Sequence, residues 1–183
     1  MLRHLPNLLT WLRLAAAPAL ALLLVSGADR AALGVFAFAG LSDAADGFLA
    51  KRFGFASRFG RFLDPAADKL LMLAAFVTLT ALKVTPLWLT LLVIARDAAI
   101  VAGIMLARML ELPIRIEPLF VGKLSTGMQI TYVALALFLL TFGLEWPRTL
   151  DAAADATAAL TILSCLAYAG VGVRALLYRH RGV

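Results

Sequence analysis

Four aspartates stand close together in this sequence, at spacings that bring carboxylates onto common helical faces. Asp43 and Asp46 are three residues apart, and Asp64 and Asp68 are four residues apart. Residues three or four apart lie on the same face of a helix. Each pair is therefore expected to act as one group of ligands if it lies on a helix.

Carboxylates gathered in this way repel one another unless cations lie between them. Oxygen ligands without His or Cys favour hard divalent ions such as Mg²⁺, Mn²⁺ or Ca²⁺ over Zn²⁺. The simpler alternative is an interfacial salt network, in which the acids pair with nearby basic side chains. Those basic side chains are Lys51, Arg52, Arg58, Arg61 and Lys69. The small residues Gly47, Ala50 and Gly60 leave room for a ligand beside the acids, which favours the metal site.

The elements that must position these acids are long apolar helices. The chain has 183 residues, of which 63% are hydrophobic, whereas soluble domains usually have about 45 to 50%. Six apolar runs each approach the ~20 residues that a membrane-spanning helix needs. The runs are Leu8–Ser26, Ala31–Leu49, Leu63–Leu82, Leu87–Leu106, Gly122–Phe142 and Ala152–Leu177. The sequence therefore predicts an all-α integral membrane protein with six transmembrane helices in a single domain, residues 1–183. The sole cysteine, Cys165, is expected to be a small buried side chain.

Basic residues set the orientation, because Lys and Arg collect on the cytoplasmic side of a membrane. With the N-terminus inside, ten basic residues fall in the inner segments: Arg3, Lys51, Arg52, Arg58, Arg61, Arg108, Arg115, Lys123, Arg179 and Arg181. Only Arg30, Lys83 and Arg148 fall in the outer loops. We therefore expect a multi-pass protein of the cell (inner) membrane, with both termini and the four acids at its cytoplasmic face. The net charge of +6 then reflects topology and contact with lipid headgroups, and no nucleic-acid partner is expected.

The acids and the small residues also follow the pattern of a known family. The pattern reads Asp43, two residues, Asp46-Gly47, two residues, Ala50, one basic residue, eight residues, Gly60, three residues, Asp64, three residues, Asp68. It resembles the signature of the CDP-alcohol phosphatidyltransferases. The family usually has Arg directly after the Ala, where this chain has Lys51. Lys keeps the charge of Arg but lacks its bidentate fork.

This resemblance implies a six-helix membrane enzyme of phospholipid biosynthesis, usually a homodimer. Such an enzyme transfers a phosphatidyl group from CDP-diacylglycerol to an acceptor hydroxyl and releases CMP. Carried over by position, Asp43, Asp46 and Asp64 would bind two divalent ions, Mg²⁺ or Mn²⁺. Asp68 would contribute to the metal site and act as the catalytic general base. These roles agree with the physical reading, since metal ions neutralise charge on a transferring group.

The same resemblance implies the nucleotide site. Gly47, Ala50 and Gly60 would make room for the nucleotide, with Lys51 near its phosphates. Near the N-terminus, Asn7, Thr10 and Arg13 follow one another at three-residue steps, and family members commonly begin in a similar way, so Asn7 and Thr10 are assigned to the nucleotide pocket. The alternative is that Asn7 or Thr10 caps the first helix while Arg13 snorkels to the headgroups.

Acceptor-binding residues are expected farther along the chain. Arg96 and Asp97 fall mid-way along the fourth apolar run, a costly depth for charged groups. Because adjacent residues do not share a helical face, the two are not expected to pair. Arg96 is therefore expected to bind an acceptor phosphate, with a structural salt bridge to another acid as the alternative. Arg115 and the segment around Lys123 would line the acceptor side, where Lys123, Ser125, Thr126 and Gln129 are expected on or near one face.

Family members that use glycerol 3-phosphate tend to have an Arg-Glu pair in the fourth helix and a second Arg two to three turns later. Here the pair is Arg96-Asp97, and Met105 stands at the nearest equivalent position. These details look more like the cardiolipin synthases of the family, which use phosphatidylglycerol. The sequence thus predicts a glycerol-type acceptor, with phosphatidylglycerol preferred and glycerol 3-phosphate (phosphatidylglycerophosphate synthase) as the alternative. A small membrane transporter or scaffold with a cation site is the alternative from another class.

Overall fold

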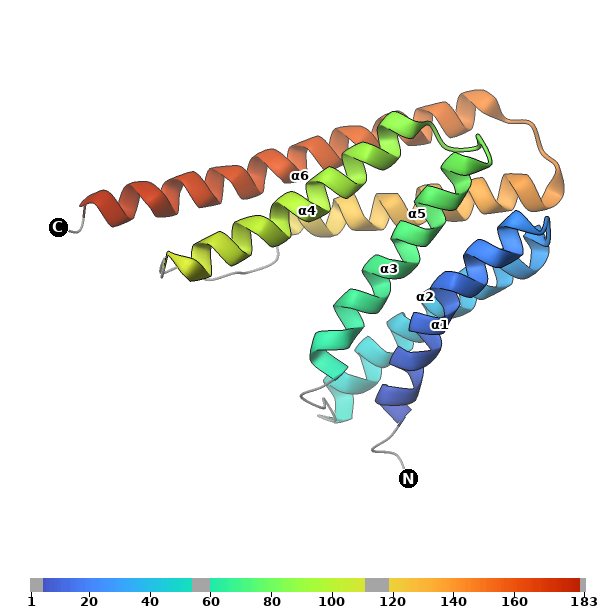
Figure 1. The fold of residues 1–183 in the computed structure, drawn as a ribbon, viewed down its shortest axis with the longest axis horizontal. Helices are drawn as coiled ribbons and strands as arrows, with labels where there is room; N and C mark the ends of the chain where they lie inside the picture. The colour runs from blue at the N-terminus through green and yellow to red at the C-terminus, as the bar shows by residue number, and fades with distance from the viewer. Residues whose placement is uncertain (1–4, 54–59, 111–118, 182–183) are drawn as a thin grey trace. The chain divides into compact units, whose positions relative to one another are not determined.

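The computed structural model describes the backbone of residues 5–53, 60–110 and 119–181, and the side chains of residues 11–42, 66–110 and 119–174. Over these ranges all the regular secondary structure is helical, which confirms the predicted all-α class. The helices, coloured from blue to red along the chain in Figure 1, are α1 (Leu5–Val25), α2 (Asp29–Phe53), α3 (Gly60–Ala81), α4 (Leu87–Met109), α5 (Phe120–Phe142) and α6 (Pro147–Arg181).

Each predicted apolar run corresponds to one of these helices, but most of the helices are longer than the runs. α2 continues to Phe53 and α3 begins at Gly60, whereas the apolar runs end at Leu49 and begin at Leu63. Hydrophobicity marks the part of a helix that prefers lipid, while backbone hydrogen bonding continues into the polar ends. All four aspartates lie within these helices, as the predicted runs already placed them.

Three helices in the described part of the chain are long and apolar enough to cross a membrane. They are Leu87–Met109, Phe120–Phe142 and the segment Pro147–Arg174 of α6. The described part of α1 contributes a shorter apolar helix, Trp11–Val25. Many large apolar side chains on these helices are exposed, among them Leu91, Met105 and Leu166, as expected of surfaces that face lipid. Cys165 is half-buried, so the expectation of a small buried side chain is met only in part.

Tight turns end α1 and α5 by the same hydrogen-bonding pattern, which α3 also shows, with Lys83 at a φ of 61° and the N–H of Val84 donating to the carbonyl of Leu79. After α1 the N–H of Ala28 donates to the carbonyl of Leu23, and after α5 the N–H of Leu144 donates to the carbonyl of Leu139. Gly27 and Gly143 supply the positive φ that this helix ending requires, at 73° and 62°.

The chain divides into two compact units. The first comprises Met1–Thr85 with Val133–Glu145, and therefore holds α1, α2, α3 and the second half of α5. In this unit α1 contacts both α2 and α3. A stripe at steps of three and four residues, Arg13, Ala17, Leu20 and Leu24, is the buried face of α1.

The second unit comprises Pro86–Tyr132 with Trp146–Val183, and holds α4, the first half of α5 and α6. α4 contacts α6, as the yellow-green and orange-red ribbons of Figure 1 show. The buried face of α6 is largely polar, with Thr157, Thr161 and Ser164 fully buried. Hydrogen bonds as well as apolar contacts therefore hold this unit together.

Candidate functional site

The four aspartates belong to α2 and α3 in the first unit. Asp43 and Asp46 are within about three turns of the end of α2, and Asp64 and Asp68 are within about three turns of the start of α3. The two helix ends are joined by residues 54–59, and a chain of that length spans at most about 25 Å. The backbone therefore keeps both acid pairs near the same pair of helix ends.

The other predicted residues of this site also lie on these helices, although their side chains are outside the described residues. Gly47, Ala50 and Lys51 are on α2, Gly60 is the first residue of α3, and Asn7 and Thr10 are in α1. The side chains of Asp43, Asp46 and Asp64 are outside the described residues as well, and Arg115 lies outside them entirely.

Asp68 is the member of the acid set whose side chain is described, and it is held by Arg13. Nη1 of Arg13 donates to Oδ1 of Asp68 at 2.8 Å. The Arg13 side chain is only 1% exposed, whereas that of Asp68 is 43% exposed. Arg13 therefore does not snorkel to the headgroups; it points into the first unit and joins α1 to α3.

The donor chemistry of the acid set fits a hard divalent cation, and the surroundings of Asp68 agree with that fit. Carboxylates that bind metal are usually hydrogen-bonded to a second residue that orients them, as Arg13 does for Asp68. Among the described side chains, no three His, Cys, Asp or Glu residues come together as a metal-binding group. Three of the four predicted ligands lie outside that part of the chain, so their role as ligands stays a prediction.

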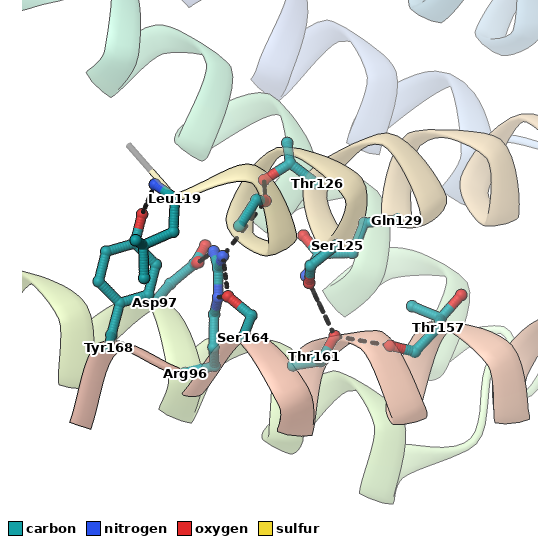
Figure 2. Close-up of polar contacts among 11 residues, drawn as sticks. Arg96, Asp97, Leu119, Ser125, Thr126, Gln129, Thr157, Thr161, Ser164 and Tyr168 are labelled. Atoms are coloured by element: carbon teal, nitrogen blue, oxygen red, sulfur yellow. Dashed lines mark hydrogen bonds and ion pairs between the residues drawn. The ribbon is translucent and has the colours of Figure 1, made fainter. Parts of the chain in front are cut away.

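Arg96 is the centre of a polar cluster in the second unit, shown in Figure 2. Its Nε and Nη2 donate to Oγ of Ser164 on α6 at 3.2 and 2.7 Å, and Nη2 also donates to the carbonyl of Gly122 on α5 at 3.4 Å. Nη1 donates to Oδ1 of Asp97 at 2.8 Å. Arg96 is 5% exposed, so one buried guanidinium joins α4, α5 and α6.

The pair between Arg96 and Asp97 contradicts the expectation that adjacent residues cannot meet. Neighbouring Cα–Cβ bonds on a helix point about 100° apart. The long Arg side chain nevertheless bends so that Nη1 reaches the carboxylate of the next residue. These contacts give Arg96 a structural role, but its acid partner is Asp97 and not an acid elsewhere in the chain. Its role in binding an acceptor stays a prediction.

Gly122 makes the close approach of Tyr168 possible. A Cβ atom added at Gly122 would lie 3.0 Å from Oη and 3.1 Å from Cε2 of Tyr168, and 3.4 Å from Nη2 of Arg96. Oη of Tyr168 accepts a hydrogen bond from the N–H of Leu119, just before α5, at 3.3 Å. The side of α5 that carries Gly122 thus packs against the hydroxyl end of Tyr168 on α6.

A row of hydroxyl groups continues the cluster between α5 and α6 (Figure 2). Thr161 donates its single hydroxyl proton to the carbonyl of Thr157 at 2.7 Å. Its oxygen therefore accepts from Oγ of Ser125 at 3.3 Å, and it also accepts from Nε2 of Gln129 at 3.4 Å. Interhelical hydrogen bonds of this kind stabilise helix pairs in membranes by about 0.6 to 2 kcal/mol each.

These contacts correct the expectation that the polar residues of α5 share one face. Ser125 and Gln129 are buried against α6, whereas Lys123 is exposed. Thr126 donates to the carbonyl of Gly122 in its own helix at 3.1 Å. Of the acceptor residues predicted here, Lys123 presents an exposed cation, and its role stays a prediction.

Sequence reasoning missed the partners that α6 supplies. Thr157, Thr161, Ser164 and Tyr168 recur at steps of four, three and four residues through an apolar run. That period marks a polar stripe on one helical face, and it was the available signal for a buried polar contact with another helix.

Comparison with known sequences identifies the family of this chain. The sequence profile of the CDP-alcohol phosphatidyltransferases matches residues 3–166, which include the whole acidic signature. The chain belongs to the CDP-alcohol phosphatidyltransferase family. The resemblance inferred from the spacing of the acids is therefore confirmed.

Several members of the CDP-alcohol phosphatidyltransferase family are similar to this chain. Cardiolipin synthase (CMP-forming) from Homo sapiens is 36% identical over 148 residues, which are 72% of this chain and 49% of the relative. The protein of that name from Streptomyces coelicolor is 39% identical over 153 residues, 80% of this chain and 70% of the relative. A probable phosphatidylglycerophosphate synthase from Mycobacterium tuberculosis is 36% identical over 144 residues, 75% of this chain and 66% of the relative. This chain spans about half the length of the human relative.

The close packing at Gly122 provides a test of the polar cluster. We expect Gly122→Ala to lower the melting temperature in detergent by about 2 to 4 °C, which corresponds to roughly 1 kcal/mol for a chain of this size. The added methyl group would press on Tyr168, which is held by a hydrogen bond, and would touch Arg96. Scanning fluorimetry of the purified variant measures the shift.

Gly127 is the matched control on the same helix, because a Cβ atom there meets nothing within 4 Å. Gly127→Ala should leave the melting temperature unchanged or raise it, since Ala is the better helix former by about 1 kcal/mol. Equal melting temperatures for the two variants would contradict the packing described at Gly122.

Proposed function

We propose that this chain is an enzyme of phospholipid biosynthesis that transfers a phosphatidyl group from CDP-diacylglycerol to a glycerol-type acceptor and releases CMP. The observation that carries the proposal is the family match over residues 3–166, which spans all four aspartates. Relatives named cardiolipin synthase (CMP-forming) and phosphatidylglycerophosphate synthase support both the reaction and the class of acceptor.

In the proposed site, Asp43, Asp46 and Asp64 hold two divalent ions, Mg²⁺ or Mn²⁺, with help from Asp68. When bound, such ions neutralise the charge of the pyrophosphate and stabilise the leaving oxygen. The nucleotide lies against the small residues Gly47, Ala50 and Gly60, with Lys51 at its phosphates and Asn7 and Thr10 beside it. These assignments follow the family signature residue by residue.

The proposed reaction is a single displacement. Asp68 accepts the proton of the acceptor hydroxyl as its oxygen attacks the phosphorus that carries diacylglycerol. A new phosphorus–oxygen bond forms to the acceptor, and the pyrophosphate bond to CMP breaks. CMP leaves with the electron pair of that bond. The exposure of Asp68, at 43% of its side chain, supports this role because a base must be reachable by its substrate.

We propose that six helices span the membrane, with both termini and the four acids at the cytoplasmic face and two copies forming a homodimer. Support comes from the three long apolar helices and from the ten basic residues in inner segments against three in outer loops. At that face a soluble nucleotide can leave to water while the lipid product stays in the bilayer.

Phosphatidylglycerol is the proposed acceptor. A glycerol 3-phosphate acceptor brings a phosphate dianion that needs nearby cations. In α4 the guanidinium of Arg96 is engaged by Asp97, Ser164 and Gly122, and the exposed residue two to three turns later is the uncharged Met105. Lys123, Thr126 and Arg115 are then the proposed contacts for the acceptor, by their place in the sequence.

The orientation is tested by single cysteines placed at residues 53–58 in a cysteine-free variant. We expect a membrane-impermeant maleimide to label them only after the cells are permeabilised, because the positive-inside rule places this segment in the cytoplasm. A cysteine at Arg148 is the control for the outer side. Labelling of residues 53–58 from outside intact cells would overturn the topology.

The reaction is tested by CMP release from CDP-diacylglycerol. We expect purified protein to release CMP only when Mg²⁺ or Mn²⁺ is added, and Asp64→Asn to lower the rate by roughly 100-fold or more, the scale of losing one electrostatic stabiliser. Asp151→Asn, at an exposed position near the start of α6, is the control and should keep the wild-type rate. Full activity of Asp64→Asn, or a transporter-like cation flux without CMP release, would refute the mechanism.

The acceptor is tested by offering phosphatidylglycerol and glycerol 3-phosphate in parallel. We expect cardiolipin to form with a kcat/KM at least about 10-fold higher than that for phosphatidylglycerophosphate, a difference of about 1.4 kcal/mol in transition-state binding. Thin-layer chromatography of radiolabelled products separates the two lipids. A preference for glycerol 3-phosphate would select the alternative acceptor and leave the reaction class unchanged.

A further inference from the structure

Arg13 and Asp68 differ in the exposure of their side chains, and this difference indicates that Arg13 holds Asp68. Arg13 belongs to the buried stripe of α1 with Ala17, Leu20 and Leu24, and its side chain is 1% exposed. Asp68 reaches it from α3 with 43% of its side chain exposed. The guanidinium is thus fixed by the packing around it, while the carboxylate remains reachable from outside the protein.

Burial makes the pairing strongly favourable for Arg13. A guanidinium removed from water without a partner costs several kcal/mol, and a carboxylate at hydrogen-bonding distance offsets much of that cost. The distance of 2.8 Å from Nη1 to Oδ1 is that of a charge-assisted hydrogen bond. A carboxylate so bound is restrained in both of its side-chain torsions, because moving it away would leave the buried charge without this partner.

We propose that Arg13 is a positioning residue for Asp68. By holding Oδ1, Arg13 fixes the carboxylate in the orientation that meets the acceptor hydroxyl and the metal site. This role rests on the proposed function of Asp68. Arg13 itself touches neither substrate nor metal in this proposal, and it exchanges no proton. A displacement of reacting groups by about 1 Å can lower the rate about 100-fold, so a residue that fixes the orientation of the base favours a high rate.

Three other roles for Arg13 make different predictions. Snorkelling to the headgroups requires an exposed guanidinium, which the 1% exposure excludes. A nucleotide-binding role would raise the KM for CDP-diacylglycerol when Arg13 is changed. A role in stability alone would lower the yield or melting temperature of the protein and leave the turnover of each folded molecule unchanged.

The kinetic test compares Arg13→Gln and Arg13→Lys with the wild type, with rates divided by the amount of folded protein from size-exclusion chromatography. We expect Arg13→Gln to lower kcat by about 10- to 100-fold while the KM for CDP-diacylglycerol changes by less than about threefold. Arg13→Lys keeps the charge and should recover at least about threefold of the lost kcat. Arg30→Gln, which removes a positive charge at an exposed position of α2, is the matched control and should keep wild-type kcat.

Two kinetic results would overturn the proposal. An unchanged kcat per folded molecule in Arg13→Gln would leave Arg13 a structural residue. A raised KM with unchanged kcat would place Arg13 in the nucleotide pocket.

A second test does not depend on activity. The melting temperatures of Arg13→Gln, Asp68→Asn and the double variant form a double-mutant cycle. Each single change leaves the other member of the pair poorly matched, so we expect the double variant to lose clearly less than the sum of the two single losses. Additive losses would show that the two side chains do not hold each other, and would overturn the proposal.

The two tests also separate this inference from the function on which it rests. Wild-type protein that releases no CMP from CDP-diacylglycerol would refute the proposed function and the positioning role together, while the thermal cycle would still report the ion pair. Wild-type activity combined with an additive cycle would refute the positioning role alone.

Discussion

The constraint on which the first unit depends is that a buried positive charge must be matched. Arg13 lies on a core-facing stripe of α1 whose other members, Ala17, Leu20 and Leu24, are apolar, and an unmatched guanidinium there would cost several kcal/mol. The carboxylate that matches it is 55 residues away in the sequence, on α3. α1 and α3 are thereby held in one register, and the register of α3 in turn sets the place of Asp64, one turn before Asp68.

The second unit obeys the same constraint with different partners. Arg96 is matched by the carboxylate of Asp97, and its remaining contacts go to a hydroxyl and a backbone carbonyl. Because Ser164 and the carbonyl of Gly122 are neutral, the guanidinium of Arg96 joins three helices with Asp97 as its acidic partner. The consequence for function is also different, because Arg13 holds an exposed carboxylate, whereas Arg96 is enclosed by groups of its own unit. A buried arginine in a membrane helix is thus explained by its partners, and its depth alone does not distinguish a ligand site from a structural bond.

The sequence predicts the helices and the family well, because both depend on patterns of residues that are close together in the chain. Apolar runs locate all six helices, and the spacing of four aspartates with Gly47 and Ala50 specifies the family. Partner choice is not local: Asp68 meets Arg13 and Ser164 meets Arg96 across 55 and 68 residues. The rule that adjacent helical residues do not meet also failed for Arg96 and Asp97, because it describes Cβ directions and neglects the reach of a long side chain.

The same difference explains why the reaction is easier to infer than the acceptor. The proposed reaction rests on acidic residues at fixed steps along α2 and α3, and that spacing can be read directly from the sequence. Acceptor choice depends on which cations remain available after the fold has used some of them, and the sequence alone does not reveal that use. Arg96 illustrates the point. Its contacts with Ser164 and Gly122 weaken the case for glycerol 3-phosphate as acceptor, because the phosphate of that acceptor is a dianion. A phosphatidylglycerol acceptor fits that arrangement, because its phosphate is a monoanionic diester and the bilayer itself holds its acyl chains.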